Sequence, residues 1–60
     1  MFITLNLKGK GKCGLDVDRI IRIEGGNIWT KIYYDGYGSV EIIEVFEMPE
    51  EIVNKINKSH

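Results

Sequence analysis

The sequence has little of what small domains use for covalent stability or for catalysis. Its 60 residues include one cysteine, Cys13, one histidine, His60, and one proline, Pro49. A single cysteine excludes a disulfide within one chain, and two Cys or His residues fall short of the four ligands of a closed structural zinc site. No Ser/His/Asp set can be assembled, and no base stands beside Cys13. We therefore predict no catalytic residues, no metal, no cofactor and no enzyme activity.

Long apolar runs and targeting signals are also missing. No stretch approaches the ~20 consecutive apolar residues that span a bilayer. The first seven residues are interrupted by polar side chains and lack the basic segment of a signal peptide. A lone cysteine agrees with a reducing compartment. The sequence thus predicts a cytoplasmic protein with no membrane partner.

The short length predicts one domain, residues 1–60, that gains stability from self-association. A domain of about 60 residues buries only about 60% of the surface exposed by its unfolded chain. Disulfides, metals or partner subunits usually compensate. With the first two absent, we predict a homo-oligomer, in its simplest form a homodimer.

The net charge of −1 gives no overall attraction to nucleic acid or membranes. Residues 1–30 hold five basic and three acidic side chains, and residues 31–60 hold three and six. This asymmetry would suit pairing between chains, but a solvated surface of mixed charge explains it more simply.

Alternation of apolar and polar residues predicts an antiparallel sheet. The alternating segments are residues 2–7, 13–18, 20–24, 28–34 and 39–46. Gly25-Gly26-Asn27 and Asp35-Gly36 are typical of tight hairpin turns. The Ile42-Ile43 pair interrupts the alternation and predicts a β-bulge.

The last segment has the pattern of a short helix beginning near Pro49. Proline fits the first helical position, and Glu50 and Glu51 then meet the positive end of the helix dipole. An apolar stripe of Ile52, Val53 and Ile56 is expected to dock on the sheet. The predicted fold class is α+β, with a small twisted antiparallel sheet of four or five strands and one short C-terminal helix.

A meander covered by one helix should be apolar on the covered face and polar on the other. We assign to the covered face Ile3, Leu5, Leu7, Cys13, Leu15, Val17, Ile21, Ile23, Ile28 and Ile32. The opposite face then holds Phe2, Ile20, Trp29 and Tyr33, with one parity of the fifth strand (Ile43 and Val45, or Phe46). Contiguous apolar surface of this kind marks an interface, so we predict that these residues contact a second copy or a partner. Two alternatives stay open: isolated surface aromatics, or a sheet that curls and partly buries both faces.

The segment Gly9-Lys10-Gly11-Lys12-Cys13-Gly14 has the spacing of a dinucleotide-binding fingerprint. That fingerprint needs a helix opening at the last glycine, whereas the following residues alternate as a strand. A hairpin loop is therefore predicted. Its lysines, Lys8, Lys10 and Lys12, could still bind phosphate beside exposed amides. With nearby aromatics they suggest a nucleotide or single-strand nucleic-acid binder as an alternative function.

One stretch resembles the FlbD-like pattern of small flagellar accessory proteins. It runs from Leu15-x-x-Asp18-x-Ile20-x-x-Ile23-Glu24 through Thr30-x-Ile32 and Val40 to Val45, and ends in Pro49-Glu-Glu-Ile-Val. The resemblance implies a β-meander followed by a short helix. In size and style the chain is also similar to small bacteriophage proteins that inhibit host defence. We predict a non-enzymatic inhibitor of this kind, which binds a bacterial host protein as a homodimer, in the host cytoplasm if phage-encoded.

Overall fold

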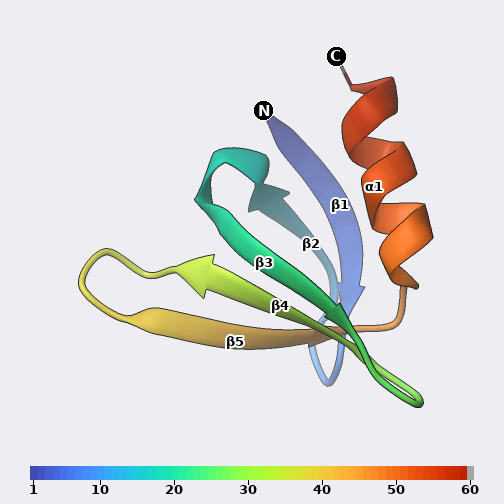
Figure 1. The fold of residues 1–60 in the computed structure, drawn as a ribbon, viewed down its shortest axis with the longest axis horizontal. Helices are drawn as coiled ribbons and strands as arrows, with labels where there is room; N and C mark the ends of the chain where they lie inside the picture. Colours follow the sequence, from blue (N-terminus) through green and yellow to red (C-terminus); the bar gives the residue numbers. More distant parts are fainter. Residues whose placement is uncertain (60) are drawn as a thin grey trace.

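The computed structural model describes residues 1–59, so the sole histidine, His60, lies outside the described residues. Five antiparallel strands precede one helix (Figure 1): β1 (Phe2–Leu7), β2 (Gly11–Asp16), β3 (Ile20–Gly25), β4 (Thr30–Asp35), β5 (Val40–Val45) and α1 (Pro49–Lys58). A 3-10 turn, Val17–Arg19, links β2 to β3. The predicted α+β class, with helix α1 starting at Pro49, is confirmed.

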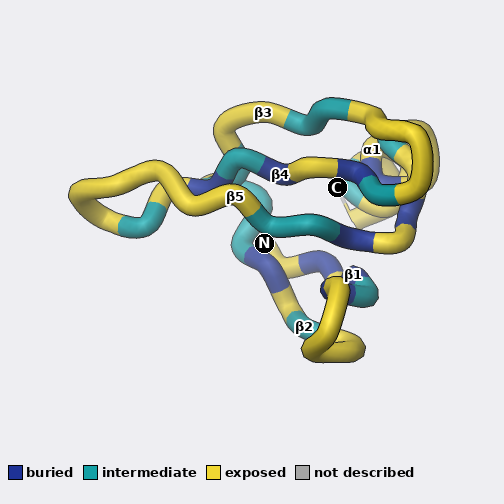
Figure 2. The backbone as a smooth tube through the Cα atoms, turned by 90° about the horizontal axis from the view of Figure 1, so that it is seen from below, coloured by how far each residue is buried: buried dark blue, intermediate teal, exposed yellow. Residues whose placement is uncertain are grey.

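The sheet has the strand order β2-β1-β5-β4-β3, so its two edge strands are joined by only three residues. Four Cα steps of about 3.8 Å reach at most about 15 Å. The edges of a flat five-stranded sheet lie about 19 Å apart, at about 4.8 Å per strand. The sheet must therefore curl, and the backbone N–H of Asp16 in β2 donates a 2.9 Å hydrogen bond to the hydroxyl of Tyr34 in β4. Figure 2 shows the β1–β2 hairpin turned away from the plane of the other three strands.

The core lies inside this curl. It consists of Ile3, Leu5, Leu7, Leu15, Ile32, Tyr34, Val45 and Ile52, with Cys13, Val17, Ile20, Ile23, Ile43 and Ile56 packed against it. Helix α1 contacts β1 and β3, and its fully buried residue is Ile52. Val53 is 46% exposed, so its predicted docking is wrong. It follows Ile52 by about 100° around the helix and faces away from the sheet.

The predicted position of the β-bulge is also wrong. The β4–β5 register is unbroken from Asp35 opposite Val40 to Thr30 opposite Val45, so no bulge lies at Ile42-Ile43. The register shift occurs instead in β3, between Ile20 and Arg22. Ile42 is an apolar residue that faces outward from a regular strand. Two adjacent apolar residues therefore interrupt the alternation in the sequence although the strand has no bulge.

This shift in β3 reverses the predicted faces of its first residues. Ile20 lies opposite Tyr34 and packs against the core, so its placement on the uncovered face is wrong. Ile21, predicted to be covered, is 58% exposed. Ile28 is exposed as well, because it lies in the turn before β4 rather than in the strand. A bulge inserts one residue and so exchanges the two faces from that point onward.

Candidate functional site

The side of β3, β4 and β5 turned away from the core holds an unusual number of large apolar side chains. Thr30, Ile32 and Tyr34 are buried in β4, so the alternating positions point to the opposite side. We call this side the outer face and define its apolar members as Trp29, Tyr33, Val40, Ile42 and Phe46. Val40, Ile42 and Phe46 are each more than half exposed. The covering helix cannot protect them, since it packs on β1 and β3 from the core side.

Trp29 and Phe46 form one end of the outer face. Their ring centroids lie 4.3 Å apart at an interplanar angle of 56°, so the two tilted rings are in direct contact. Trp29 precedes Thr30 at the start of β4, and Phe46 follows Val45 at the end of β5. Thr30 and Val45 are buried and lie directly opposite one another. The close turn before β4 depends on Gly26, because a Cβ there would lie 2.6 Å from the Trp29 carbonyl oxygen.

Tyr33, Ile42 and Val40 form the other end. Tyr33 lies directly opposite Ile42 in the β4–β5 ladder, and the Arg22 guanidinium lies 5.4 Å from the Tyr33 ring centroid. Arg22 in turn pairs with Glu24 at 2.6 Å. The cross-strand pairing of an aromatic with a β-branched residue stabilises the sheet while leaving both side chains on the surface.

A row of alternating charges separates the two apolar ends. Lys31 of β4 lies opposite Glu24 on one side and Glu44 on the other. The row ends at Lys8, whose Nζ lies 3.7 Å from Glu44 Oε1 and 5.1 Å from the Trp29 ring centroid. The outer face is therefore not one apolar patch but two, with a polar stripe between them that presents both signs of charge.

The predicted interface residues are only partly brought together. Trp29 and Tyr33 share the outer face, whereas Ile20 packs on the core and Phe2, 69% exposed, lies on the β1–β2 hairpin near Gly14. Sequence reasoning missed Val40 and Ile42, because the expected bulge obscured the parity of β5. For the fifth strand, the sequence left open whether Phe46 or the pair Ile43 and Val45 lies on the uncovered face.

The lysine loop is a hairpin turn, as predicted, and β2 rather than a helix runs through Gly14. Gly9 and Gly11 have φ angles of 77° and 78°, in the left-handed region that glycine adopts readily. Two backbone amides are already used, since Lys8 N–H donates to Glu44 and Lys10 N–H donates to Leu7. Lys8 is held at Glu44, while Lys10 and Lys12 are exposed.

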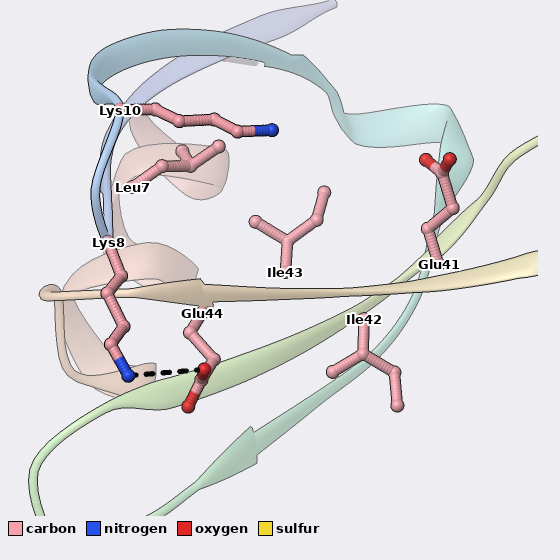
Figure 3. Close-up of a pocket in the computed structure, with 7 residues that line it drawn as sticks. All are labelled: Leu7, Lys8, Lys10, Glu41, Ile42, Ile43 and Glu44. Atoms are coloured by element: carbon pink, nitrogen blue, oxygen red, sulfur yellow. Dashed lines mark ion pairs between the residues drawn. The ribbon is translucent and has the colours of Figure 1, made fainter.

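A groove of about 540 Å³ opens between this loop and β5 (Figure 3), lined by Leu7, Lys8, Lys10, Glu41, Ile42, Ile43 and Glu44. Lys10 extends across the groove from the loop, and Glu41 and Ile43 point into it from β5. Leu7 forms part of the floor. The groove is thus lined by apolar side chains and by two charges of each sign, of which Lys8 and Glu44 pair with one another.

A separate cluster fixes the 3-10 turn to the β4–β5 turn. Arg19 Nε donates a 2.9 Å hydrogen bond to the Asp35 carbonyl oxygen. Its guanidinium carbon lies 4.7 Å from the Tyr34 ring centroid and 4.1 Å from that of Tyr37. Stacked between two rings, Arg19 closes one end of the curled sheet.

Within residues 1–59 no group of three or more Cys, Asp or Glu residues is placed to hold a metal ion. None of the helices formed by these residues is long and apolar enough to cross a membrane. The sequence matches no known protein family, and neither a curated protein nor a solved structure resembles it significantly.

Proposed function

We propose that the chain is a non-enzymatic binding protein that assembles as a homodimer and binds a bacterial protein through its outer face. The observation that supports this proposal is the exposure of Trp29, Tyr33, Val40, Ile42 and Phe46 on one side of the sheet, while a complete core lies on the other. Large apolar patches with aromatic residues are typical of protein–protein contact. The charged row between the patches would fix the partner's orientation.

A compact binder without catalytic residues changes its partner by occupying part of the partner's surface. Inhibition of a bacterial protein, in the manner of small phage inhibitors of host defence, is the specific function we propose. The partner should present apolar side chains at two separated positions with polar groups of both signs between them, to match Trp29/Phe46, the charge row and Tyr33/Ile42.

The test is capture of partners from bacterial lysate on immobilised protein, followed by purification of the captured protein and measurement of its affinity. Phe46→Glu should lower that affinity by about tenfold or more, because it introduces a charge into an apolar contact. Thr4→Glu is the matched control, since Thr4 is exposed on the β1–β2 hairpin and the charge change is the same. Equal affinities for the two variants would refute the outer face as the binding site.

One observation favours a second candidate, a binder of nucleotides or single-stranded nucleic acid. The Lys8 ammonium lies 5.1 Å from the Trp29 ring centroid, so a cation and a stacking surface are neighbours. Titration with fluorescent oligothymidylate at about 50 mM and about 200 mM salt would test it, because phosphate contacts weaken steeply as salt rises. The FlbD-like role stays a third prediction, which a flagellar component among the captured proteins would favour.

A further inference from the structure

We propose that the homodimer forms through the open edge of β5, where residues 40–42 pair antiparallel with the same residues of a second copy. The inference rests on the proposed function, for which it supplies the geometry of assembly. It leaves the outer face free for the bacterial partner. The contact between the two copies is made by the main chain of β5 rather than by an apolar patch.

β5 is an inner strand over only part of its length. Its one register pair with β1 is Leu7 opposite Val45, and the last hydrogen bond between them runs from Lys8 N–H to the Glu44 carbonyl oxygen. The chain then turns at Gly9 into β2. Because backbone groups alternate along a strand, the N–H and C=O of Val40 and Ile42 point the same way as those of Glu44, away from β4. No backbone group of residues 1–59 is paired with them on that side.

This edge has fewer of the features that protect the other two edges. β2 carries Lys12 and two glycines, and β3 carries a bulge with Arg22 and Glu24. Such features discourage pairing with another chain. The open part of β5 reads Val-Glu-Ile-Ile, without proline, glycine or lysine, and Val40 and Ile42 are 59% and 58% exposed. Its one charged residue, Glu41, points into the groove, and the β-branched residues on either side of it make this edge a template for a further strand.

The arrangement of free groups selects one register. A two-fold axis at Glu41 places Val40 opposite Ile42 of the second copy and Ile42 opposite Val40, which gives four backbone hydrogen bonds and two apolar pairs. A two-fold axis at Ile42 would direct Val40 at Glu44, whose carbonyl already accepts from Lys8. The register centred on Glu41 uses only the backbone groups of Val40 and Ile42, which have no partner among residues 1–59 on the side away from β4.

The groove beside β5 supplies positive charges that can compensate the Glu41 carboxylates of the two copies. In this register Glu41 faces Glu41 of the second copy, a repulsive arrangement when uncompensated. Lys10 extends across the groove toward Glu41 in each copy (Figure 3), so two ammonium groups flank the two carboxylates. The result is a continuous six-stranded sheet that brings the two Tyr33/Ile42/Val40 patches side by side.

Total chemical synthesis of the 60-residue chain gives the sharpest test. N-methylisoleucine at position 42 removes one edge N–H and keeps the side chain, and the β4–β5 ladder does not use that N–H. N-methylglycine at Gly14 is the matched control, because the same alternation directs its N–H to the outer edge of β2. Sedimentation equilibrium from about 10 µM to about 1 mM covers the affinities expected of so short an edge.

The unmodified chain and the Gly14 control should reach twice the 6.9 kDa mass of one chain. Methylation at Ile42 should weaken dimerisation about tenfold or more, and Lys10→Gln should also weaken it, because the facing Glu41 carboxylates would lose their compensating charge. A monomer at all concentrations, or a dimer unaffected by methylation at Ile42, would overturn the proposal. Dimerisation is tested by methylation at Ile42, whereas binding of the bacterial partner is tested by Phe46→Glu. The two proposals can therefore fail independently of one another.

Discussion

At the scale of single residues, Glu47 ties β1 to the link between β5 and α1. Among residues 1–59 it is the buried carboxylate, and its oxygens accept hydrogen bonds from the Asn6 backbone N–H at 3.0 and 3.1 Å and from Asn6 Nδ2 at 2.8 Å. Phe46 N–H, just before it, donates to the Asn6 carbonyl oxygen. Glu47 therefore satisfies the β1 amide at the point where β5 ends and the chain leaves for α1.

Glu47→Ala should lower the free energy of unfolding by about 1–3 kcal/mol, the usual cost of leaving a buried donor unsatisfied. Glu47→Gln keeps one acceptor oxygen for Asn6 and should cost less. Glu50→Gln, at an exposed position of the helix, is the control. Urea denaturation of the three variants measures the differences. Equal stability of Glu47→Ala and the control would mean that the Asn6 amide is satisfied in another way.

At the scale of elements, helix α1 shows what the pattern determines and what it leaves open. Its start at Pro49 and its docking through Ile52 follow from proline at the first position and from an apolar stripe. The stripe in the sequence includes Val53 equally, yet Val53 is exposed. Only the position of β1 and β3 around the helix decides which of two adjacent apolar residues is buried.

Ile52→Ala should lower the free energy of unfolding by about 2–5 kcal/mol, because it empties a fully buried site. Natural domains have total stabilities of about 5–15 kcal/mol, so this variant should be sharply less stable at 37 °C. Val53→Ala, one residue along, should change stability by less than about 0.5 kcal/mol, as surface substitutions usually do. Thermal melts of both variants supply the comparison. Similar shifts would contradict the orientation of the helix.

At the scale of the whole molecule, stability and assembly are coupled. A 60-residue chain with a core of eight buried apolar residues should be only marginally stable alone. Association of folded chains stabilises the folded state by mass action. Within residues 1–59 the curled sheet buries its core but leaves residues 40–42 of β5 without a strand on the side away from β4 and the outer face uncovered.

The Tm should therefore rise with protein concentration between about 10 µM and about 1 mM. N-methylation at Ile42 should flatten this dependence, whereas Phe46→Glu should preserve it, because the outer face is assigned to another partner. Differential scanning calorimetry at four or five concentrations gives the measurement. A Tm that does not vary with concentration in the unmodified chain would count against coupled folding and dimerisation.

The sequence by itself determined the elements of this protein. The two-residue periodicity, the glycine turns and the Pro49 signal act over a few neighbouring residues, and the strands, hairpins and helix agree with them. The same local information predicted the hairpin at Gly9–Gly14, since no helix signal follows those glycines.

The tertiary structure decided the faces and the edges. The bulge at Ile20–Arg22 moved Ile20 into the core and exposed Ile21, and the curl of the sheet separated Phe2 from Trp29 and Tyr33. The charge row from Glu24 to Lys8 joins residues of three strands and of the turn after β1, and the open edge of β5 depends on where β1 ends beside it. Strand order and register are set by packing between distant segments, and no periodicity in one segment contains that information.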